Sequence, residues 1–171
     1  MPIRPRRTHK ISKFRRIELV VVLHNIRSLH NVGSIFRTAE AAGVKTLYLT
    51  GITPAPIDRF GKLIPSFAKV SLGAEKTVVW EKVSSIVATA RKVRKEGYKI
   101  CAVEQSKHSI PFYTFKRKIG KTALILGNEV RGLPKGVLGL ADHIIEIPMH
   151  GKKESLNVGV AAGIVIFGFL Y

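Results

Sequence analysis

The sequence predicts an α/β fold in which a mostly parallel β-sheet is flanked by helices. Short runs of β-branched and other apolar residues alternate along the chain with longer amphipathic segments, and this alternation is typical of βαβ units. The 171 residues, of which 46% are hydrophobic, fit one domain that is large enough to bury a core. We therefore expect a single domain over residues 17–171, preceded by a separate arm over residues 1–16.

Residues 1–16 are expected to form a flexible basic arm. They are rich in Lys and Arg and contain no Asp or Glu, and Pro2 and Pro5 oppose regular structure. Two interpretations stay open, a tail that binds phosphates and a merely solvated terminus. The arm has no apolar core of the kind that a secretory signal needs, so we expect no such signal.

Residues 17–50 predict a parallel βαβ unit. Residues 17–23 are rich in β-branched side chains and predict a buried strand. Residues 31–42 have apolar side chains at helical spacing, with Asn31 in the N-cap position and Gly43 as the end of the helix. Residues 46–50 predict the second strand, which a helical crossover makes parallel to the first.

Residues 51–76 predict a long irregular loop because they are interrupted by prolines. A loop of this length in a compact domain is usually functional, so we expect a lid that faces the substrate. Residues 77–80 predict a short strand, and residues 81–96 predict an amphipathic helix with Val87 on its buried face. The basic face of that helix meets water or RNA, and we assign no site to it.

The last third of the chain predicts three more strands and a final helix. Strands are expected at residues 99–103, 122–126 and 143–147, with a polar, basic connection over residues 104–121. Pro134 suits the first turn of a short helix. Ser155 is expected to cap and begin the final helix.

The apolar end of the chain predicts a buried helix rather than a membrane span. Residues 158–171 are apolar or glycine throughout, but a bilayer needs about 20 such residues. A helix that is apolar all round is consistent with burial on more than one face.

The charge of the chain predicts a polyanionic partner. Lys and Arg number 29 against 11 Asp and Glu, which gives a net charge of +18. This imbalance favours RNA or DNA as the partner, ahead of an acidic membrane surface, and the alternative is a protein that is merely basic. Cys101 is the only cysteine, which excludes an internal disulfide and fits a reducing, cytoplasmic compartment.

Two stretches of the last third predict the ligand site. TALILGNEVRG at residues 122–132 and IPMHGKKESLNVGVA at residues 147–161 place polar residues and glycines directly after buried strands, where α/β sheets usually bind ligands. The glycine-rich dinucleotide fingerprint is absent after the first strand, and the usual acid after the second strand is missing, which disfavours an ordinary dinucleotide fold. The histidines are scattered without ligand spacing, so we expect no metal site.

The sequence resembles the SpoU/TrmH family of RNA ribose 2′-O-methyltransferases, in the SPOUT class. The resemblance rests on NVGSIFRTAE at residues 31–40, LGNEVRGLP at residues 126–134, and IPM at residues 147–149 followed by SLNV at residues 155–158. These three motifs occur in the family's order, and the resemblance extends from about residue 18 to residue 171.

The resemblance implies a fold, a cofactor and an assembly. It implies a deep trefoil knot at the C-terminal end that holds S-adenosylmethionine, and a homodimer with the site near its interface. Such a knot is an exception to the rule that chains do not thread loops. The cofactor would be held mainly by the backbone. The residues carried over for cofactor binding are Gly127, Ile147 and Leu156, with Leu126, Met149 and Glu104 as further candidates.

The resemblance also implies the catalytic residues. Arg37 matches the arginine linked to activation of the ribose hydroxyl; because a guanidinium stays protonated, its expected role is to bind phosphate and to stabilise oxyanion charge. Asn31 either caps its helix or positions Arg37 or RNA. Glu129 either accepts hydrogen bonds from loop amides or holds Asn157 and Ser155, and its alternative is a solvated turn acid. For Ser155 and Asn157, capping and chemistry both stay open.

The chain departs from the family pattern at two points, and two other functions stay open. Gly159 stands where the family often has a second serine, and a separate N-terminal RNA-binding domain is missing, for which the basic arm is a candidate substitute. The first expectation is a methyltransferase acting on a ribose 2′-hydroxyl of tRNA or rRNA. The alternatives are a non-catalytic basic RNA-binding protein and an enzyme of the same fold that methylates a base nitrogen.

Overall fold

The computed structural model describes residues 17–115 and 120–170, and the structural statements below concern these residues. The predicted arm over residues 1–16 lies outside them.

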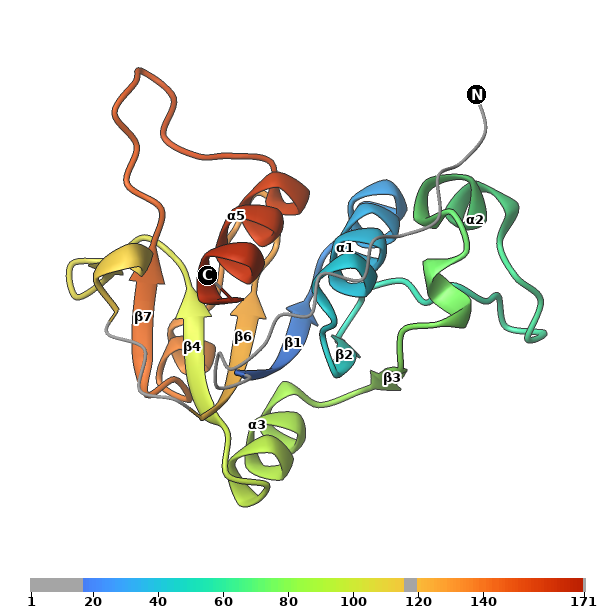
Figure 1. Ribbon diagram of the computed structural model, residues 1–171, viewed down its shortest axis with the longest axis horizontal. Helices are drawn as coiled ribbons and strands as arrows, with labels where there is room; N and C mark the ends of the chain where they lie inside the picture. The colour runs from blue at the N-terminus through green and yellow to red at the C-terminus, as the bar shows by residue number, and fades with distance from the viewer. Residues whose placement is uncertain (1–16, 116–119, 171) are drawn as a thin grey trace, which may run out of the picture.

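Within the described residues, seven strands form one sheet in the order β3-β2-β1-β6-β4-β7-β5, and every pairing is parallel (Figure 1). This confirms the predicted α/β fold with a parallel sheet. The strands are β1 Glu18–His24, β2 Thr46–Thr50, β3 Trp80–Val83, β4 Lys99–Val103, β5 Ile110–Pro111, β6 Lys121–Leu126 and β7 His143–Glu146.

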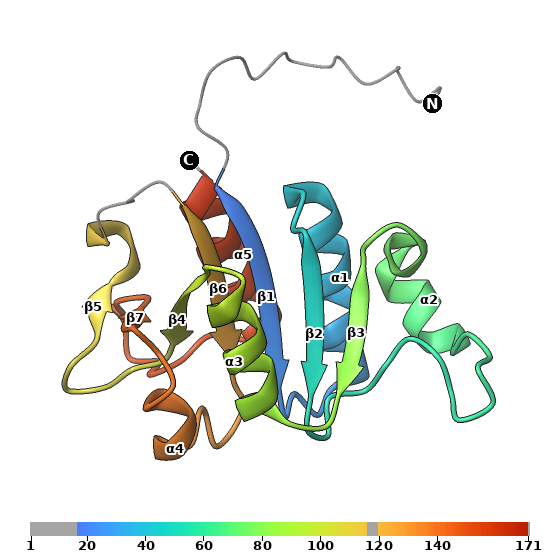
Figure 2. The same ribbon diagram turned by 90° about the horizontal axis from the view of Figure 1, so that it is seen from below.

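Helices cover both faces of the sheet. Figure 2 shows α3 and α4 in front of the sheet, with α1 and α5 behind it. Alternate residues of β1 therefore enter different cores: Leu19 and Leu23 pack towards α1 and α5, while Val20 and Val22 pack towards α3 and α4. Because both faces are covered, the inner strands are nearly continuous apolar runs. The helices are α1 Leu29–Ala42, α2 Pro65–Ser71, α3 Ile86–Lys95, α4 Lys135–Leu138 and α5 Val158–Leu170.

Both helices that carry predicted site residues begin elsewhere than expected. Helix α1 begins at Leu29, because the Ser28 hydroxyl accepts a hydrogen bond from the Asn31 amide at 3.2 Å and makes Ser28 the N-cap. The prediction of Asn31 as the N-cap is therefore wrong, whereas Gly43 ends the helix in the left-handed conformation as predicted. Helix α5 begins at Val158 rather than at Ser155, because Asn157 Oδ1 accepts from the amide of Gly159 at 2.8 Å.

The segment after β2 is more ordered than predicted. Its second half contains α2 and a 3₁₀ turn at Ala74–Lys76, so the prediction of one irregular loop over residues 51–76 is wrong there. Phe67 of α2 is fully buried and makes an edge-to-face contact with Phe36 of α1, with ring centroids 5.1 Å apart. This half of the segment is part of the core, and only residues 51–64 keep the character of a surface loop.

The elements that follow are also displaced. The strand predicted over residues 77–80 lies at Trp80–Val83, because Trp80 pairs with Leu47 of β2. The helix predicted from residue 81 begins at Ile86, since the Ser85 hydroxyl caps it by accepting from the Ala88 amide at 3.2 Å. Val87, predicted to be buried, is exposed.

The last third follows the prediction closely, with additions in its long connection. Strand β4 has the predicted bounds, and β6 and β7 agree with theirs within one residue at an end. The connection over residues 104–121 contains the short strand β5 and a 3₁₀ turn at Phe112–Thr114. No helix within the described residues is long and apolar enough to cross a membrane.

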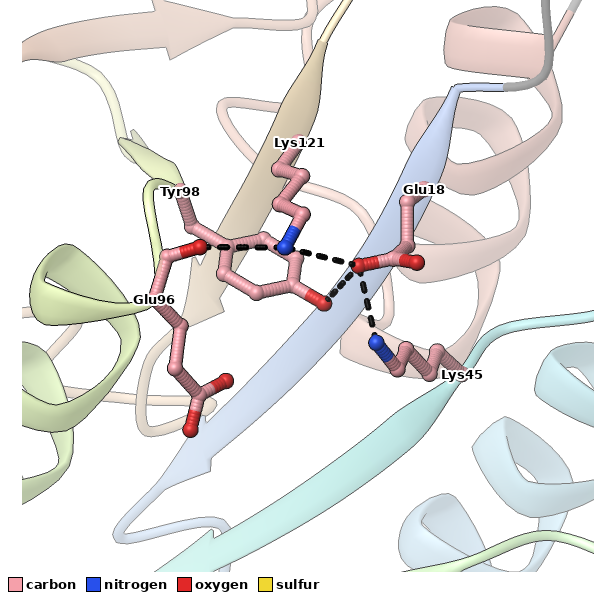
Figure 3. Close-up of polar contacts among 5 residues, drawn as sticks. All are labelled: Glu18, Lys45, Glu96, Tyr98 and Lys121. Carbon is pink, nitrogen blue, oxygen red and sulfur yellow. Dashed lines mark hydrogen bonds and ion pairs between the residues drawn. The ribbon is translucent and has the colours of Figure 1, made fainter.

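A polar cluster joins the amino ends of the strands (Figure 3). Oε1 of Glu18 accepts hydrogen bonds from the Tyr98 hydroxyl at 2.5 Å and from Lys45 Nζ at 2.9 Å, and Lys121 Nζ lies 3.7 Å away. The hydrogen bond from Tyr98 lowers the pKa of Glu18, and burial together with Glu18 raises the pKa of Tyr98 to about 12. Internal pairing thus links the amino ends of β1, β2, β4 and β6.

Candidate functional site

A cavity of about 360 Å³ opens at the carboxyl edge of the sheet. The loops that follow β4, β6 and β7 and the start of α5 contribute to its lining, as expected where parallel strands end together. Its volume lies in the range of small-molecule sites. All the residues predicted to bind the cofactor line this cavity: Glu104, Leu126, Gly127, Ile147, Met149 and Leu156.

The charge of the cavity differs from that of the whole chain. Although the net charge is +18, no Lys, Arg or His appears among the described lining residues. The charged lining residues are Glu104, Glu129, Glu146 and Glu154. The acids suit a cationic ligand, and the apolar side chains of Leu126, Ile147 and Leu156 suit a flat ring. Both properties fit S-adenosylmethionine, which carries an adenine and a net positive charge from a sulfonium, an ammonium and one carboxylate.

The turn after β6 forms one wall of the cavity and is fixed by close packing. A Cβ at Gly127 would lie 2.7 Å from Leu133 Cγ and 2.8 Å from the carbonyl carbon of Gly132, so any side chain there displaces the turn. Asn128 Oδ1 accepts from the amides of Val130 at 3.0 Å and Arg131 at 2.9 Å. The turn is therefore rigid because of both its glycine and its asparagine.

Two further contacts anchor this turn to its neighbours. Asn128 Nδ2 donates to the carbonyl of Asn25 at 2.8 Å, which ties the turn to the loop after β1. The carboxylate of Glu104 accepts from the amides of Leu133 at 2.7 Å and Gln105 at 3.0 Å. Glu104 thus lines the cavity while its carboxylate holds the end of the turn.

A chain of hydrogen bonds joins the three motifs. Asn31 Nδ2 donates to Glu129 Oε1 at 3.1 Å, and Asn31 Oδ1 accepts from Asn157 Nδ2 at 3.0 Å. Asn157 Oδ1 in turn accepts from the amides of Gly159 and Val160 in the first turn of α5. One amide side chain therefore fixes the turn after β6 and the start of α5 relative to each other.

Glu129 is also the anion at the start of α1. Its carboxylate accepts from the amides of Arg27 and Ser28, each at 3.1 Å, which corresponds to the first of the alternatives left open for Glu129. Burial raises the pKa of Glu129, but the hydrogen bonds from Arg27, Ser28 and Asn31 outweigh burial and hold the pKa below its usual value. Glu129 reaches Asn157 only through Asn31.

Two predicted catalytic residues stand apart from this chain. Ser155 lines the cavity but is exposed and makes no hydrogen bond within the part of the chain that the structure describes. Arg37 is exposed on α1, about 9 Å along the helix axis from Asn31, and is not among the lining residues. Its guanidinium makes no hydrogen bond or ion pair within residues 17–115 and 120–170. Arg37 therefore does not line the cavity of its own chain in this structure.

The structure adds residues that pattern reading had not singled out. Asn25 has a positive φ of 57°, which is uncommon for a residue other than glycine and is visible only in the structure. Ser28 was hidden because Asn31 also suits a helix start. Glu146 and Glu154 carry no local signal, since only the fold brings them to the cavity.

The described residues offer neither a cluster of metal ligands nor an activated thiol. These residues contain no group of His, Cys, Asp and Glu that could hold a metal ion. Cys101 is buried in β4, and burial together with Asp142 raises the pKa of its thiol to about 12. A thiol with so high a pKa stays protonated and is a poor nucleophile.

Sequence comparison finds one matching family profile and many relatives. The profile of the SpoU rRNA Methylase family matches residues 18–167. A tRNA (guanosine(18)-2′-O)-methyltransferase of Aquifex aeolicus is 32% identical over 167 residues, covering 96% of this chain and 74% of the relative. A 23S rRNA (guanosine-2′-O-)-methyltransferase RlmB of Ralstonia nicotianae is 33% identical over 150 residues, covering 87% of this chain and 57% of the relative.

Solved structures resemble this fold closely. An rRNA methyltransferase from Sinorhizobium meliloti, with AdoMet bound, superposes with a TM-score of 0.79 at 29% identity. The match covers 89% of this chain and 55% of the other. The chain thus spans little more than half the length of these rRNA methyltransferases and about three quarters of the Aquifex tRNA enzyme.

Proposed function

The chain belongs to the SpoU rRNA methylase family, and from this premise we propose that it methylates a ribose 2′-hydroxyl of tRNA or rRNA with S-adenosylmethionine as the methyl donor. The observation that carries the proposal is the acid-lined cavity at the carboxyl edge of the sheet, built from the second and third motifs and tied to the first through Asn31. The related enzymes act on guanosine ribose in tRNA and in 23S rRNA, which supports both classes of RNA as substrates.

The residues of the cavity hold the cofactor in this proposal. S-adenosylmethionine, when bound, supplies a methyl group activated by a sulfonium. The peptide groups at Gly127, Ile147 and Leu156 would hold the adenine edge, and their apolar surroundings would cover its faces. Since these contacts are mainly made by the backbone, conservative side-chain changes at Ile147 or Leu156 leave much of the affinity.

The hydrogen-bonded chain positions the substrate side. Glu129, Asn31 and Asn157 hold the helix starts and the turn in one arrangement, so that the acceptor ribose meets a fixed surface. Arg37 binds the RNA phosphate and stabilises the charge that develops on the ribose oxygen. The ribose proton leaves to solvent water and not to Arg37, because a guanidinium stays protonated.

A homodimer completes the site in this proposal. Helix α5 presents apolar side chains to solvent in the single chain, with Val160 52% and Ile164 37% exposed. Contact with a second copy of the chain buries this face of α5. In that dimer Arg37 acts at the cavity of the partner subunit. The family also implies the C-terminal trefoil knot, which stays a prediction. A role in RNA processing is consistent with a cytoplasmic location.

Calorimetric titration with S-adenosylmethionine and with S-adenosylhomocysteine tests the cofactor site. We expect micromolar binding, or about −8 kcal/mol. Methyl transfer to unmodified tRNA and rRNA then follows, with nuclease digestion and mass analysis of the nucleosides. A 2′-O-methyl nucleoside is expected. A methyl group on a base nitrogen refutes ribose methylation, and RNA affinity without cofactor binding replaces the enzyme with a non-catalytic RNA-binding protein.

A further inference from the structure

A second cavity lies on the other side of the turn after β6. It has a volume of about 630 Å³, and Asn128, Val130 and Gly132 line both cavities, so the turn is a shared wall. The other lining residues of the second cavity are Asn25, Arg27, Ile52, Arg131 and Pro134.

The charged lining residues of this second cavity are Arg27 and Arg131. The described lining contains no Asp or Glu. Both arginines are exposed, and within the described part of the chain neither guanidinium makes a hydrogen bond or an ion pair. Their backbones are nevertheless fixed, because the Arg27 amide donates to Glu129 and the Arg131 amide donates to Asn128. Two free guanidinium groups are thus carried by an ordered backbone at one cavity.

Apolar side chains stand beside these arginines. Val130 is 85% exposed and Ile52 is 65% exposed, although both line the cavity. Asn25 orders this side of the cavity, since its Oδ1 accepts from the Ile52 amide at 3.1 Å. Guanidinium groups suit a phosphate, and aliphatic side chains suit the face of a base, so the two kinds of group together match a nucleotide rather than a simple anion.

The shared turn therefore separates two opposite electrostatic environments. The first cavity has acids and no described base, and the second has arginines and no described acid. A cationic donor on one side and an anionic acceptor on the other would lie against the same few residues. Such a separation suits a reaction between a cation and a polyanion.

We propose that the second cavity binds the RNA strand next to the target ribose, with Arg27 and Arg131 on a backbone phosphate and Ile52 and Val130 against the adjoining base. The inference rests on the proposed function for the identity of the substrate. It adds a substrate-binding site to the candidate catalytic residues. Arg27 and Ile52 of this site lie outside the three motifs, whereas Val130 and Arg131 lie within the second motif.

RNA affinity without cofactor tests this inference. Fluorescence anisotropy with fluorescein-labelled, unmodified tRNA transcripts is measured for Arg27→Ala and Arg131→Ala over a series of salt concentrations. Each variant is expected to bind about tenfold more weakly, because each loses a charged hydrogen bond. Each should also lower the slope of log affinity against log salt by about 1.

Arg91→Ala is the matched control, because Arg91 is an exposed arginine on α3 with the same charge. Its effect on affinity is expected to stay within about twofold, as for a charge away from the contact. Circular dichroism and cofactor titration establish that each variant is folded. Arg27→Lys and Arg131→Lys keep the charge and are expected to recover part of the lost affinity.

Equal effects of the two cavity variants and Arg91→Ala would overturn the inference. The anisotropy measurement needs no methyl transfer, so it separates this result from failure of the proposed function. An inactive wild type whose RNA affinity depends on Arg27 and Arg131 would refute the enzyme and keep the RNA site. An active wild type with unchanged affinity in both variants would refute only the RNA site.

Discussion

Asn31 shows how one side chain can serve three motifs. Its amide donates to Glu129 and accepts from Asn157, so the two ends of the group have different partners. Aspartate has nearly the same shape but lacks the donor, and it would add a second carboxylate beside Glu129. The site therefore requires an amide at this position, for a reason that lies in the hydrogen-bond pattern.

Arg37→Ala separates binding from chemistry at the residue scale. We expect cofactor affinity to stay unchanged, because Arg37 does not line the cavity, and kcat to fall by about 10²–10³, the usual cost of losing a group that stabilises an oxyanion. Calorimetry and single-turnover methyl transfer measure the two quantities. Arg91→Ala serves as the control for loss of a surface charge, and undiminished methylation by Arg37→Ala would remove Arg37 from the mechanism.

The lowered pKa of Glu129 leads us to expect that the free energy of unfolding depends on pH. Because its hydrogen bonds lower its pKa in the folded state, its contribution is fully present above the unfolded value, about 4.5, and is lost as pH falls through the folded value. Glu129→Gln should therefore be less stable than wild type at pH 7, with a gap that narrows below about pH 4.5.

Urea unfolding between pH 7 and pH 3 measures this gap. Glu40→Gln is the control, since it removes a carboxylate on α1, the helix at whose start Glu129 lies, and this carboxylate makes no hydrogen bond within the described residues. If the difference in free energy of unfolding between wild type and Glu129→Gln stays constant with pH, the lowered pKa of Glu129 in the folded state is contradicted.

At the scale of the element, the turn after β6 predicts a steric effect. Gly127→Ala should weaken cofactor binding at least tenfold and destabilise the fold by about 1–3 kcal/mol, because the added Cβ meets Leu133 and the Gly132 backbone. Gly136→Ala in α4 is the matched control, since nothing lies within 4 Å of its added Cβ. Thermal unfolding and cofactor titration compare the two variants. Equal stabilities and equal cofactor affinities would show that the turn accommodates the added Cβ without loss of stability or binding.

Helix α5 predicts the assembly at the scale of the whole molecule. Wild type is expected at twice the chain mass of 18.9 kDa in light scattering, and Ile164→Glu should shift it to the monomer and reduce methyl transfer. Val79→Glu is the control, because Val79 is an exposed apolar residue outside α5. A wild-type monomer with full activity would refute the dimer.

The sequence predicted the molecule best where local pattern decides structure. The inner strands and the end of α1 at Gly43 follow from apolar runs and a glycine. The second and third family motifs located part of the lining of the first cavity, including Gly127, Ile147 and Leu156. Pattern failed where a distant partner decides. Trp80 is part of a strand because it pairs with Leu47 of β2. Helix α2 is part of the core because its Phe67 packs against Phe36 of α1. Arg27 and Arg131 meet only because β1 and β6 end together.

The central position of β6 in the sheet determines how much of the chain must be synthesised before the sheet can form. Strand β6 pairs with β1 and β4, and joining Glu18 to Lys121 closes a loop of roughly a hundred residues. During synthesis β1 can pair with β2 early, but its inner neighbour emerges only with the last third of the chain. Contacts so distant in sequence make folding slow. The link from Glu129 through Asn31 to Asn157 therefore forms late, so a nascent chain acquires its ligand site only after Asn157 has left the ribosome.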